Sequence, residues 1–157
     1  METSQRTADR VATRTYILLS VAGTTYALRS HEVRHMEMVD QVTVVPNAPP
    51  FVEGVVFSRG QVVPVLNLRV RFGFERVARD LRTRLLVVEA AGRTIGLLAD
   101  AAREFVQIPD SAIRPPSEAI AGLSGNYLDG VATLGERIVL ILNLRHVIDA
   151  VPSVAAQ

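Results

Sequence analysis

Two histidines that flank a glutamate form the most reactive pattern in this chain, the H-E-x-x-H motif of His31, Glu32 and His35. On a helix, histidines four positions apart share one face and can bind zinc, and the glutamate can activate a zinc-bound water. A catalytic zinc needs a third protein ligand. Glu53 follows only after three prolines, and no third histidine stands at the spacing of longer zinc motifs. A zinc peptidase therefore stays open as an alternative with an incomplete set of ligands.

Other patterns of catalytic residues are missing from the sequence. It contains no G-x-S-x-G motif and no glycine-rich loop followed by lysine, and the third histidine, His146, stands in no paired-carboxylate pattern. Cysteine is absent, which excludes disulfides, thiol nucleophiles and cysteine metal ligands. We therefore predict no catalytic residues, no metal site and no cofactor.

An arginine-rich segment at residues 69–84 is the other candidate for ligand binding. Its six arginines are Arg69, Arg71, Arg76, Arg79, Arg82 and Arg84. The net charge of the chain is only +1, and Glu75 and Asp80 lie inside the segment. A solvated connector is the simpler interpretation, and a nucleic-acid-binding module is the alternative.

Length and composition predict a small domain that remains in the cytoplasm. The 157 residues can bury an apolar core, which must be aliphatic because tryptophan is absent. Residues 1–14 are polar and are expected to form a disordered leader, and residues 151–157 a tail. No apolar run approaches the roughly 18 residues of a membrane helix, no signal sequence follows Met1, and cysteine is absent, so we predict a cytoplasmic protein without direct membrane insertion.

An internal repeat organises the chain and positions these candidates. Residues 51–69 recur without a gap at residues 127–145, 76 positions further along, and both copies end in Leu-Asn-Leu-Arg. Each copy has an apolar run, a glycine-containing turn and a second β-branched run, which is the pattern of a β-hairpin. Gly54 and Gly130 occupy matching places, and we expect valine at either place to damage the fold.

A second hairpin pattern is repeated in the same way. Residues 16–28 are matched by residues 85–97, which lie 69 positions further along. Residues 30–36 and 100–105 follow the two copies and are predicted to be short helical turns. The second of these segments lacks both histidines of the H-E-x-x-H motif, which favours a structural role for the first.

The two halves of the repeat, about residues 15–82 and 83–150, each contain four short strands and one turn. No helical period of a dozen residues interrupts them. Closure removes exposed sheet edges, so this pattern predicts an all-β fold of two small, closed or nearly closed β-barrels.

Nine short motifs between residues 26 and 137 carry a resemblance to a known family that covers about residues 16–149. They are Tyr26-Ala-Leu28, Val33…Met36, Val45-Pro-Asn-Ala-Pro49, Phe51-Val-Glu-Gly-Val55, Arg59-Gly-Gln-Val-Val-Pro-Val65, Asn67-Leu-Arg69, Ile113-Arg-Pro115, Tyr127-Leu-Asp-Gly130 and Leu134-Gly-Glu-Arg137. In this order the motifs resemble the CheW family of bacterial chemotaxis coupling proteins. The resemblance implies one CheW-like domain at residues 15–150, made of two intertwined SH3-like five-stranded barrels that share an apolar interface.

The same resemblance implies a function and partners. It implies a non-catalytic adaptor, monomeric when isolated, that joins the cytoplasmic signalling tip of methyl-accepting chemoreceptors to the regulatory domain of a CheA-like histidine kinase. Val33, Gly54 and Arg59 would face the receptor in a groove between the barrels, whereas the kinase would dock on exposed barrel surface, at residues that the sequence does not identify. An SH3-like nucleic-acid-binding module remains the alternative for residues 69–84.

The sequence departs from the family pattern beside these positions. Phe57-Ser58 stands where the family usually has Asn-Leu, and His35 stands where it usually has glutamate. We expect His35 to be exposed, so that His35→Glu would leave the free energy of unfolding nearly unchanged.

The residues themselves also favour Arg59 as a partner contact. The repeat places Gly135 at the equivalent position, so the barrel does not require a long cationic side chain there. A guanidinium pairs well with carboxylate or backbone oxygens across an interface. Phe57 would supply the apolar part of the same receptor-binding surface, or would pack into the core, where strand phenylalanines are more common.

Overall fold

The computed structural model describes residues 13–116, 127–149 and 151–152. Within these ranges, most residues with regular structure lie in strands that form two sheets, here called sheet A and sheet B. Sheet A consists of β1 (Thr13–Val21), β2 (Thr24–Arg29), β8 (Ala101–Pro109), β9 (Ile113–Arg114), β10 (Leu128–Leu134) and β11 (Arg137–Leu142). Sheet B consists of β3 (Val33–Glu37), β4 (Val52–Ser58), β5 (Gln61–Asn67), β6 (Arg84–Ala90) and β7 (Arg93–Ala99).

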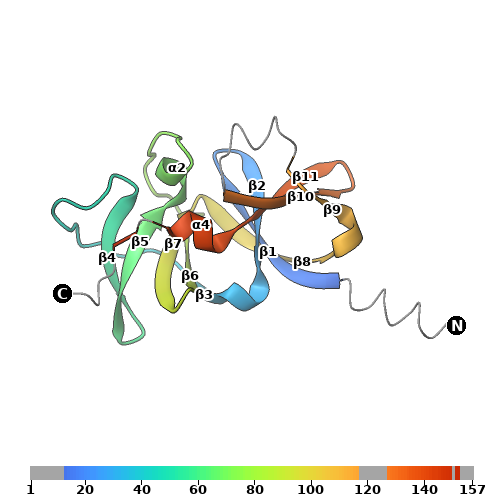
Figure 1. Ribbon diagram of the computed structural model, residues 1–157. Helices are drawn as coiled ribbons and strands as arrows, with labels where there is room; N and C mark the ends of the chain where they lie inside the picture. The colour runs from blue at the N-terminus through green and yellow to red at the C-terminus, as the bar shows by residue number, and fades with distance from the viewer. Residues whose placement is uncertain (1–12, 117–126, 150, 153–157) are drawn as a thin grey trace, which may run out of the picture.

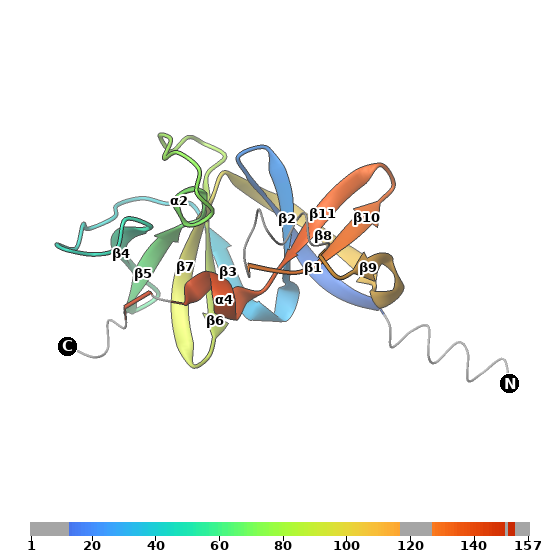
Figure 2. The same cartoon turned by 45° about the horizontal axis from the view of Figure 1, so that its top comes forward.

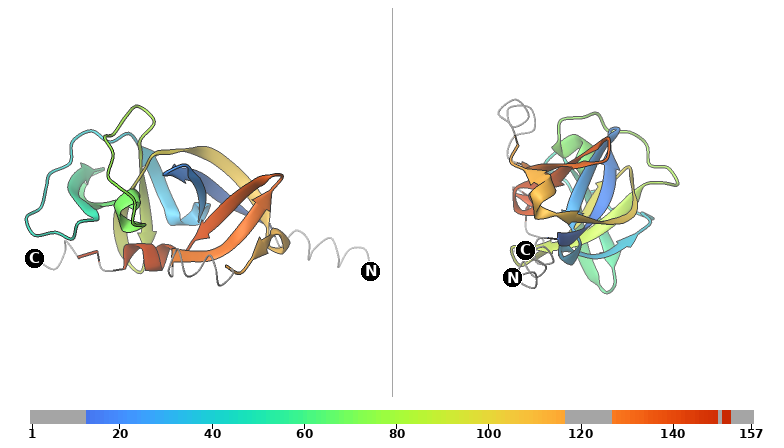
Figure 3. Two further views of the ribbon diagram at one scale, coloured as in Figure 1. Left: turned by 90° about the horizontal axis from the view of Figure 1, so that it is seen from above. Right: turned by 90° about the vertical axis from the view of Figure 1, so that its right-hand side faces the viewer.

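The two sheets lie side by side along the long axis of the molecule (Figures 1 and 3). Their strand orders are β8-β1-β2-β11-β10-β9 and β3-β6-β7-β5-β4. The short helices between the strands are η1 (Ser30–Glu32), α2 (Leu68–Arg71), η2 (Asp110–Ala112) and α4 (Leu144–Ile148). The last of these, α4, lies at the junction between the sheets (Figure 2).

Each sheet takes one hairpin from each half of the repeat. In sheet B the β4–β5 hairpin of the first half joins the β6–β7 hairpin of the second half through the parallel pair of Val65 with Gly96. In sheet A the β10–β11 hairpin joins β1–β2 through the matching parallel pair of Ile141 with Ala27. The two halves are therefore intertwined, and neither sheet is made by one half alone.

Apolar residues fill an interior in each sheet and a third region between the sheets. Sheet A encloses a cluster that includes Leu18 and Ile141, and sheet B encloses one that includes Leu85 and Val63. A larger cluster joins residues of both sheets with the buried face of α4. The predicted two-barrel, all-β architecture with a shared apolar interface is confirmed.

Strands β1 and β6 are apolar on both faces because each borders two of these clusters. In β6, Leu85 faces the interior of sheet B and Leu86 faces the cluster between the sheets. In β1, Leu18 faces the interior of sheet A and Leu19 faces the cluster between the sheets. Continuous burial explains why the sequence shows uninterrupted apolar runs here and not the alternation of a half-exposed strand.

Four boundaries differ from the expectations drawn from the sequence. Of residues 30–36, predicted to be a helical turn, only the first three form η1 and the rest lie in β3. Residues 100–105, also predicted to be a helical turn, lie mostly in β8, and the short helix follows at η2. Strand β1 begins at Thr13, inside the stretch expected to be a disordered leader, while residues 1–12 lie outside the described residues. Val151 is 4% exposed and packs into the central cluster although the sequence placed it in a tail.

Asn67 and Asn143, which are equivalent in the repeat, make matching hydrogen bonds at the starts of two short helices. The Asn67 side chain accepts a hydrogen bond from the Val70 amide at the start of α2 (3.3 Å) and donates one to Glu53 (2.7 Å). Asn143 does the same at α4, where it accepts from the His146 amide (3.1 Å) and donates to Asp129 (2.9 Å). Asparagine is a favourable residue at a helix N-cap, which explains its place in both copies.

Candidate partner-binding surface

The tip of the β4–β5 hairpin carries the most exposed of the predicted site residues. Along β4 the side chains alternate, so Val56 and Ser58 are buried while Phe57 between them is 76% exposed. Phe57 is paired across the hairpin with Val62, which is 50% exposed. Phe57 is therefore not a core residue, and it forms an apolar surface together with Val62.

Arg59 lies in the two-residue turn of this hairpin. Its φ is 47° and that of Gly60 is 86°, as in the type I′ turn that matches the twist of a hairpin. The equivalent Gly135 has a φ of 63° and adopts this region without a side-chain penalty. The Arg59 side chain is exposed and makes no hydrogen bond or ion pair with another described residue.

Gly54 and Val33 occupy other places than the hairpin tip. Gly54 is buried in β4, where Thr43 runs directly alongside it and pairs with Val55. Val33 begins β3, the opposite edge of sheet B, and packs half-buried against the central cluster. The structure therefore brings Gly54, Phe57 and Arg59 onto one hairpin and leaves Val33 on another strand.

A pocket of about 290 Å³ connects the end of β3 with this turn. Arg34 and His35 line it from β3, and Ser58 and Arg59 line it from the hairpin. The two edges of sheet B thus meet at the pocket, which we call the sheet B pocket.

His35 is held beside the pocket by contacts with two residues that the sequence did not identify. Its Nε2 lies 3.2 Å from Ser58 Oγ and 3.0 Å from Glu37 Oε2, and the Ser58 hydroxyl also donates to Glu37 (3.2 Å). The His35 side chain is only 14% exposed. The expectation of an exposed His35 was wrong, because this histidine links β3 to β4 where the sheet closes.

We accordingly expect His35→Glu to lower the free energy of unfolding by about 1 kcal/mol, or 2–4 °C in Tm. The new carboxylate cannot donate to Glu37 and would be placed close to it. Thermal unfolding at neutral pH measures the loss, and His31→Glu is the matched control because His31 is exposed. Equal Tm values for both variants and the wild type would contradict the structural role of His35.

The H-E-x-x-H motif does not lie on a helix. His31 and Glu32 belong to the short helix η1, and His35 lies within strand β3. The two histidines therefore do not share a helical face, which is the geometry that the zinc peptidase alternative requires. Glu32 Oε1 is buried without a hydrogen-bond partner among the described residues, and burial raises the pKa of this carboxyl against the opposing effects of Arg29 and His31.

A pH dependence follows from the raised pKa of Glu32. Because folding favours the protonated form, the wild type loses stability as the pH rises through the raised pKa. We expect Glu32→Gln to raise Tm at pH 7. The gain should disappear at a pH below the pKa that the Glu32 carboxyl has in the unfolded chain, because both side chains are neutral there. Unfolding curves of both proteins between pH 4 and pH 8 test this, and a gain that is independent of pH would contradict it.

The arginine-rich segment is largely occupied by contacts within the protein. Arg69 is paired with Asp100 at 2.8 Å, Arg76 with Glu53 at 2.7 Å, and Arg71 donates to carbonyls at the end of α4. Among the six arginines of this segment, only the side chains of Arg79 and Arg82 make no hydrogen bond or ion pair with another described residue.

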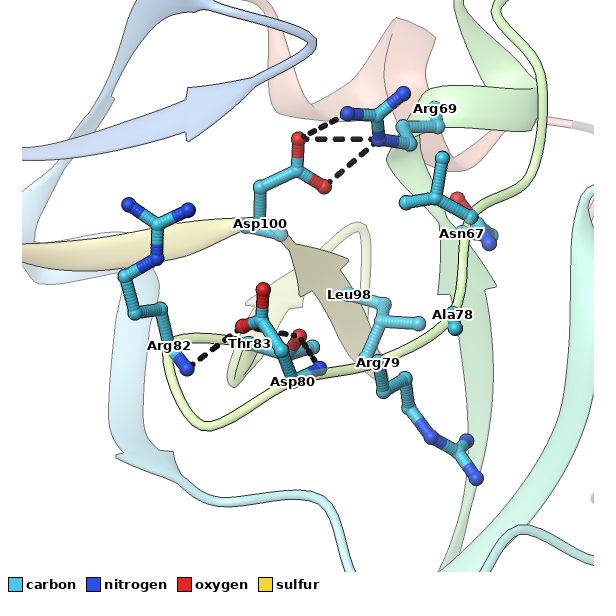
Figure 4. A pocket seen from close by; sticks show the side chains of 11 residues that line it. Asn67, Arg69, Ala78, Arg79, Asp80, Arg82, Thr83, Leu98 and Asp100 are labelled. Atoms are coloured by element: carbon cyan, nitrogen blue, oxygen red, sulfur yellow. Dashed lines mark hydrogen bonds and ion pairs between the residues drawn. The ribbon is translucent and has the colours of Figure 1, made fainter.

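Figure 4 shows how this segment folds back on the end of β7 around a small pocket of about 90 Å³. The Arg82 amide and Thr83 hold Asp80 within the loop, and the hydrogen bond from the Arg82 amide is the main reason that the pKa of the Asp80 carboxyl is lowered. Arg69 reaches the same pocket already bound to Asp100. These contacts match a structured connector, and they leave few cations for nucleic acid.

Comparisons with known proteins agree with this architecture. A family model described as a CheW-like domain matches residues 15–151. The chemotaxis protein CheW of Klebsiella aerogenes is 27% identical over 150 residues, covering 96% of this chain and 90% of the relative. Protein FrzA of Myxococcus xanthus is 40% identical over 76 residues, which is 48% of this chain and 47% of that protein.

A solved structure has the same fold. The crystal structure of scaffolding protein TtCheW from Thermoanaerobacter tengcongensis superposes with a TM-score of 0.81 at 26% identity, covering 87% of this chain and 93% of that chain. Among the described residues, no helix has the length and apolar character needed to cross a membrane. Because the family model spans nearly all of the described residues, the chain belongs to the CheW-like domain family.

Proposed function

We propose that this protein is a non-catalytic adaptor that couples methyl-accepting chemoreceptors to a CheA-like histidine kinase. The observation that carries the proposal is the hairpin tip, where the exposed Phe57 lies beside Arg59, whose side chain makes no hydrogen bond or ion pair with another described residue. Membership of the family and the likeness to a scaffolding protein support the adaptor role.

The composition of the tip fits a protein interface. Aromatic residues and arginine dominate binding energies at interfaces, and Phe57 and Arg59 lie two positions apart on the same hairpin. The turn holds Arg59 in a backbone conformation that costs a non-glycine residue about 1 kcal/mol. Since the repeat shows glycine at this place, we attribute the arginine to binding and not to folding.

The experiment compares two partners with one variant. We expect Arg59→Glu to fold normally but to bind a receptor signalling-tip fragment at least about tenfold more weakly, equivalent to roughly 1.4 kcal/mol, while its affinity for the kinase regulatory domain is retained. Calorimetric titration against each partner separately measures both affinities. Arg82→Glu is the matched control, because the Arg82 side chain also makes no hydrogen bond or ion pair with another described residue but lies in the connector loop.

The outcomes separate the receptor assignment from a general defect. Unchanged receptor affinity of Arg59→Glu, or an equal loss for both partners, would show that Arg59 does not mark the receptor surface. Failure of the wild type to bind either partner would overturn the adaptor proposal itself.

A further inference from the structure

The sheet B pocket has a counterpart in sheet A, as the repeat requires. A smaller pocket of about 110 Å³ lies between β8, β1 and the start of β11, and we call it the sheet A pocket. Four wall positions of the two pockets are equivalent in the repeat: His35 and Glu104, Val87 and Leu18, Thr94 and Thr25, and Gln61 and Arg137.

The sheet A pocket is neutralised by the protein's own side chains. Arg137 donates from Nη2 to Glu104 Oε2 at 3.3 Å, so this cation and this carboxylate satisfy each other across β11 and β8. The pair shows that a glutamate at this position of the repeat can supply a carboxylate to an arginine of the facing hairpin. In sheet B the repeat places Gln61 at the position of Arg137, so both members of this pair are replaced there.

The sheet B pocket lacks such a carboxylate. His35 replaces the glutamate, and the wall contains two arginines, Arg34 and Arg59, and no acidic residue. Arg34 is paired outside the wall with Glu89 at 3.1 Å. Arg59 has no partner among the described residues, so it is the cation without a counter-charge at this pocket.

The acidic neighbour of His35 does not take this role. Glu37 is not part of the pocket wall, and its Oε2 is already within bonding distance of His35 Nε2 (3.0 Å) and of the Ser58 hydroxyl (3.2 Å). These contacts engage the Glu37 carboxylate within the protein.

We propose that the sheet B pocket binds the carboxylate of an aspartate or glutamate in an acidic segment of the partner, which takes the place that Glu104 fills in sheet A. The Arg59 guanidinium can pair with both carboxylate oxygens, and the Thr94 hydroxyl and Gln61 amide on the same wall are further donors. This inference rests on the proposed function only in assigning the segment to the receptor tip.

His35 is the specificity-determining residue of this site. A glutamate at this position would place a carboxylate in the wall of the pocket that Arg59 also lines, and would repel an incoming carboxylate. The open volume, about 290 Å³ against about 110 Å³, matches a site that admits a side chain from outside.

The test uses a small probe and needs no receptor or kinase. The full-length protein is titrated with N-acetyl-glutamate N-methylamide while NMR follows the arginine Nε–H and histidine ring resonances. We expect saturable shifts at Arg59 and His35, and no saturable shift with the matching glutamine compound. Arg59→Gly keeps the turn, because glycine favours a φ of 47°, and should reduce probe affinity at least about tenfold.

Two further variants complete the test. His35→Glu should reduce probe affinity as strongly as Arg59→Gly, whereas Arg137→Ala, in the sheet A pocket, should leave it unchanged. Equal shifts with the glutamine compound, or full affinity in Arg59→Gly, would overturn the carboxylate site. Tighter binding of inorganic phosphate than of the carboxylate would overturn it in favour of a phosphate site. Because only the probe is used, failure here leaves the adaptor proposal standing.

Discussion

Replacing Gly54 with alanine should lower the free energy of unfolding by at least about 3 kcal/mol. A Cβ atom at Gly54 would lie 2.1 Å from the carbonyl oxygen of Thr43, which is backbone and cannot rotate away. The φ of Gly54 is 146°, a backbone conformation that residues with a Cβ atom rarely adopt. Strand β4 would have to separate from the Thr43 segment to accept even one methyl group.

Gly130 provides the internal comparison, because it is the equivalent position in sheet A. There a Cβ would lie 2.6 Å from Ile113 Cγ2 and 3.1 Å from the Arg114 carbonyl oxygen. Since the isoleucine side chain can move, we expect Gly130→Ala to lower the free energy of unfolding by only about 1–2 kcal/mol. Urea unfolding of both variants measures the difference, and a larger loss in Gly130→Ala would contradict the assignment of the close approach at Gly54.

The second large effect is expected at Arg71, which joins α2 of the first half to the end of α4 in the second. Its Nε donates to the Val147 carbonyl (2.9 Å) and its Nη2 to the carbonyls of His146 (3.2 Å) and Asp149 (2.7 Å). The guanidinium also lies over the rings of Phe51 (4.5 Å) and Tyr127 (5.0 Å). We expect Arg71→Met to lower the free energy of unfolding by about 2–4 kcal/mol.

Conservative replacement separates charge from geometry at this site. Lysine keeps the charge but cannot reach three carbonyls with a planar group, so Arg71→Lys should recover less than half of the loss. Arg79→Met is the control, because the Arg79 side chain has no partner among the described residues and its loss should cost no more than about 0.5 kcal/mol. If Arg71→Met and Arg79→Met unfold at the same urea concentration, the contacts of Arg71 do not stabilise the fold.

The repeat made the hairpins predictable, because apolar runs around a glycine turn are a local pattern. All four hairpins lie where the sequence placed them, at residues 16–28, 51–69, 85–97 and 127–145. Their partners were not predictable in the same way. Two equivalent hairpins offer equivalent edges, so similarity alone does not decide whether a hairpin pairs within its own half or with the other.

The site was predictable only where it depends on the turn. The comparison of Arg59 with Gly135 identified an arginine that the fold does not need, and the structure shows it exposed. The contacts of His35 were missed, because its partners Ser58 and Glu37 are recognised only when β3 meets the β4–β5 hairpin at the closure of sheet B. The serine that follows Phe57 was a usable signal, since a polar residue on the buried side of a strand must find a hydrogen bond.

The exchange of hairpins between the halves sets the order in which the chain can complete its sheets during synthesis. Sheet B needs strands only up to Ala99, so it can close while the rest of the chain is still being made. Hairpin β1–β2 is made first, but its neighbours in sheet A are β8 and β11, and β11 ends at Leu142. The face of these early strands that carries Leu18 is therefore among the last to be covered, and it is exposed to other nascent chains and to chaperones until β11 has been made.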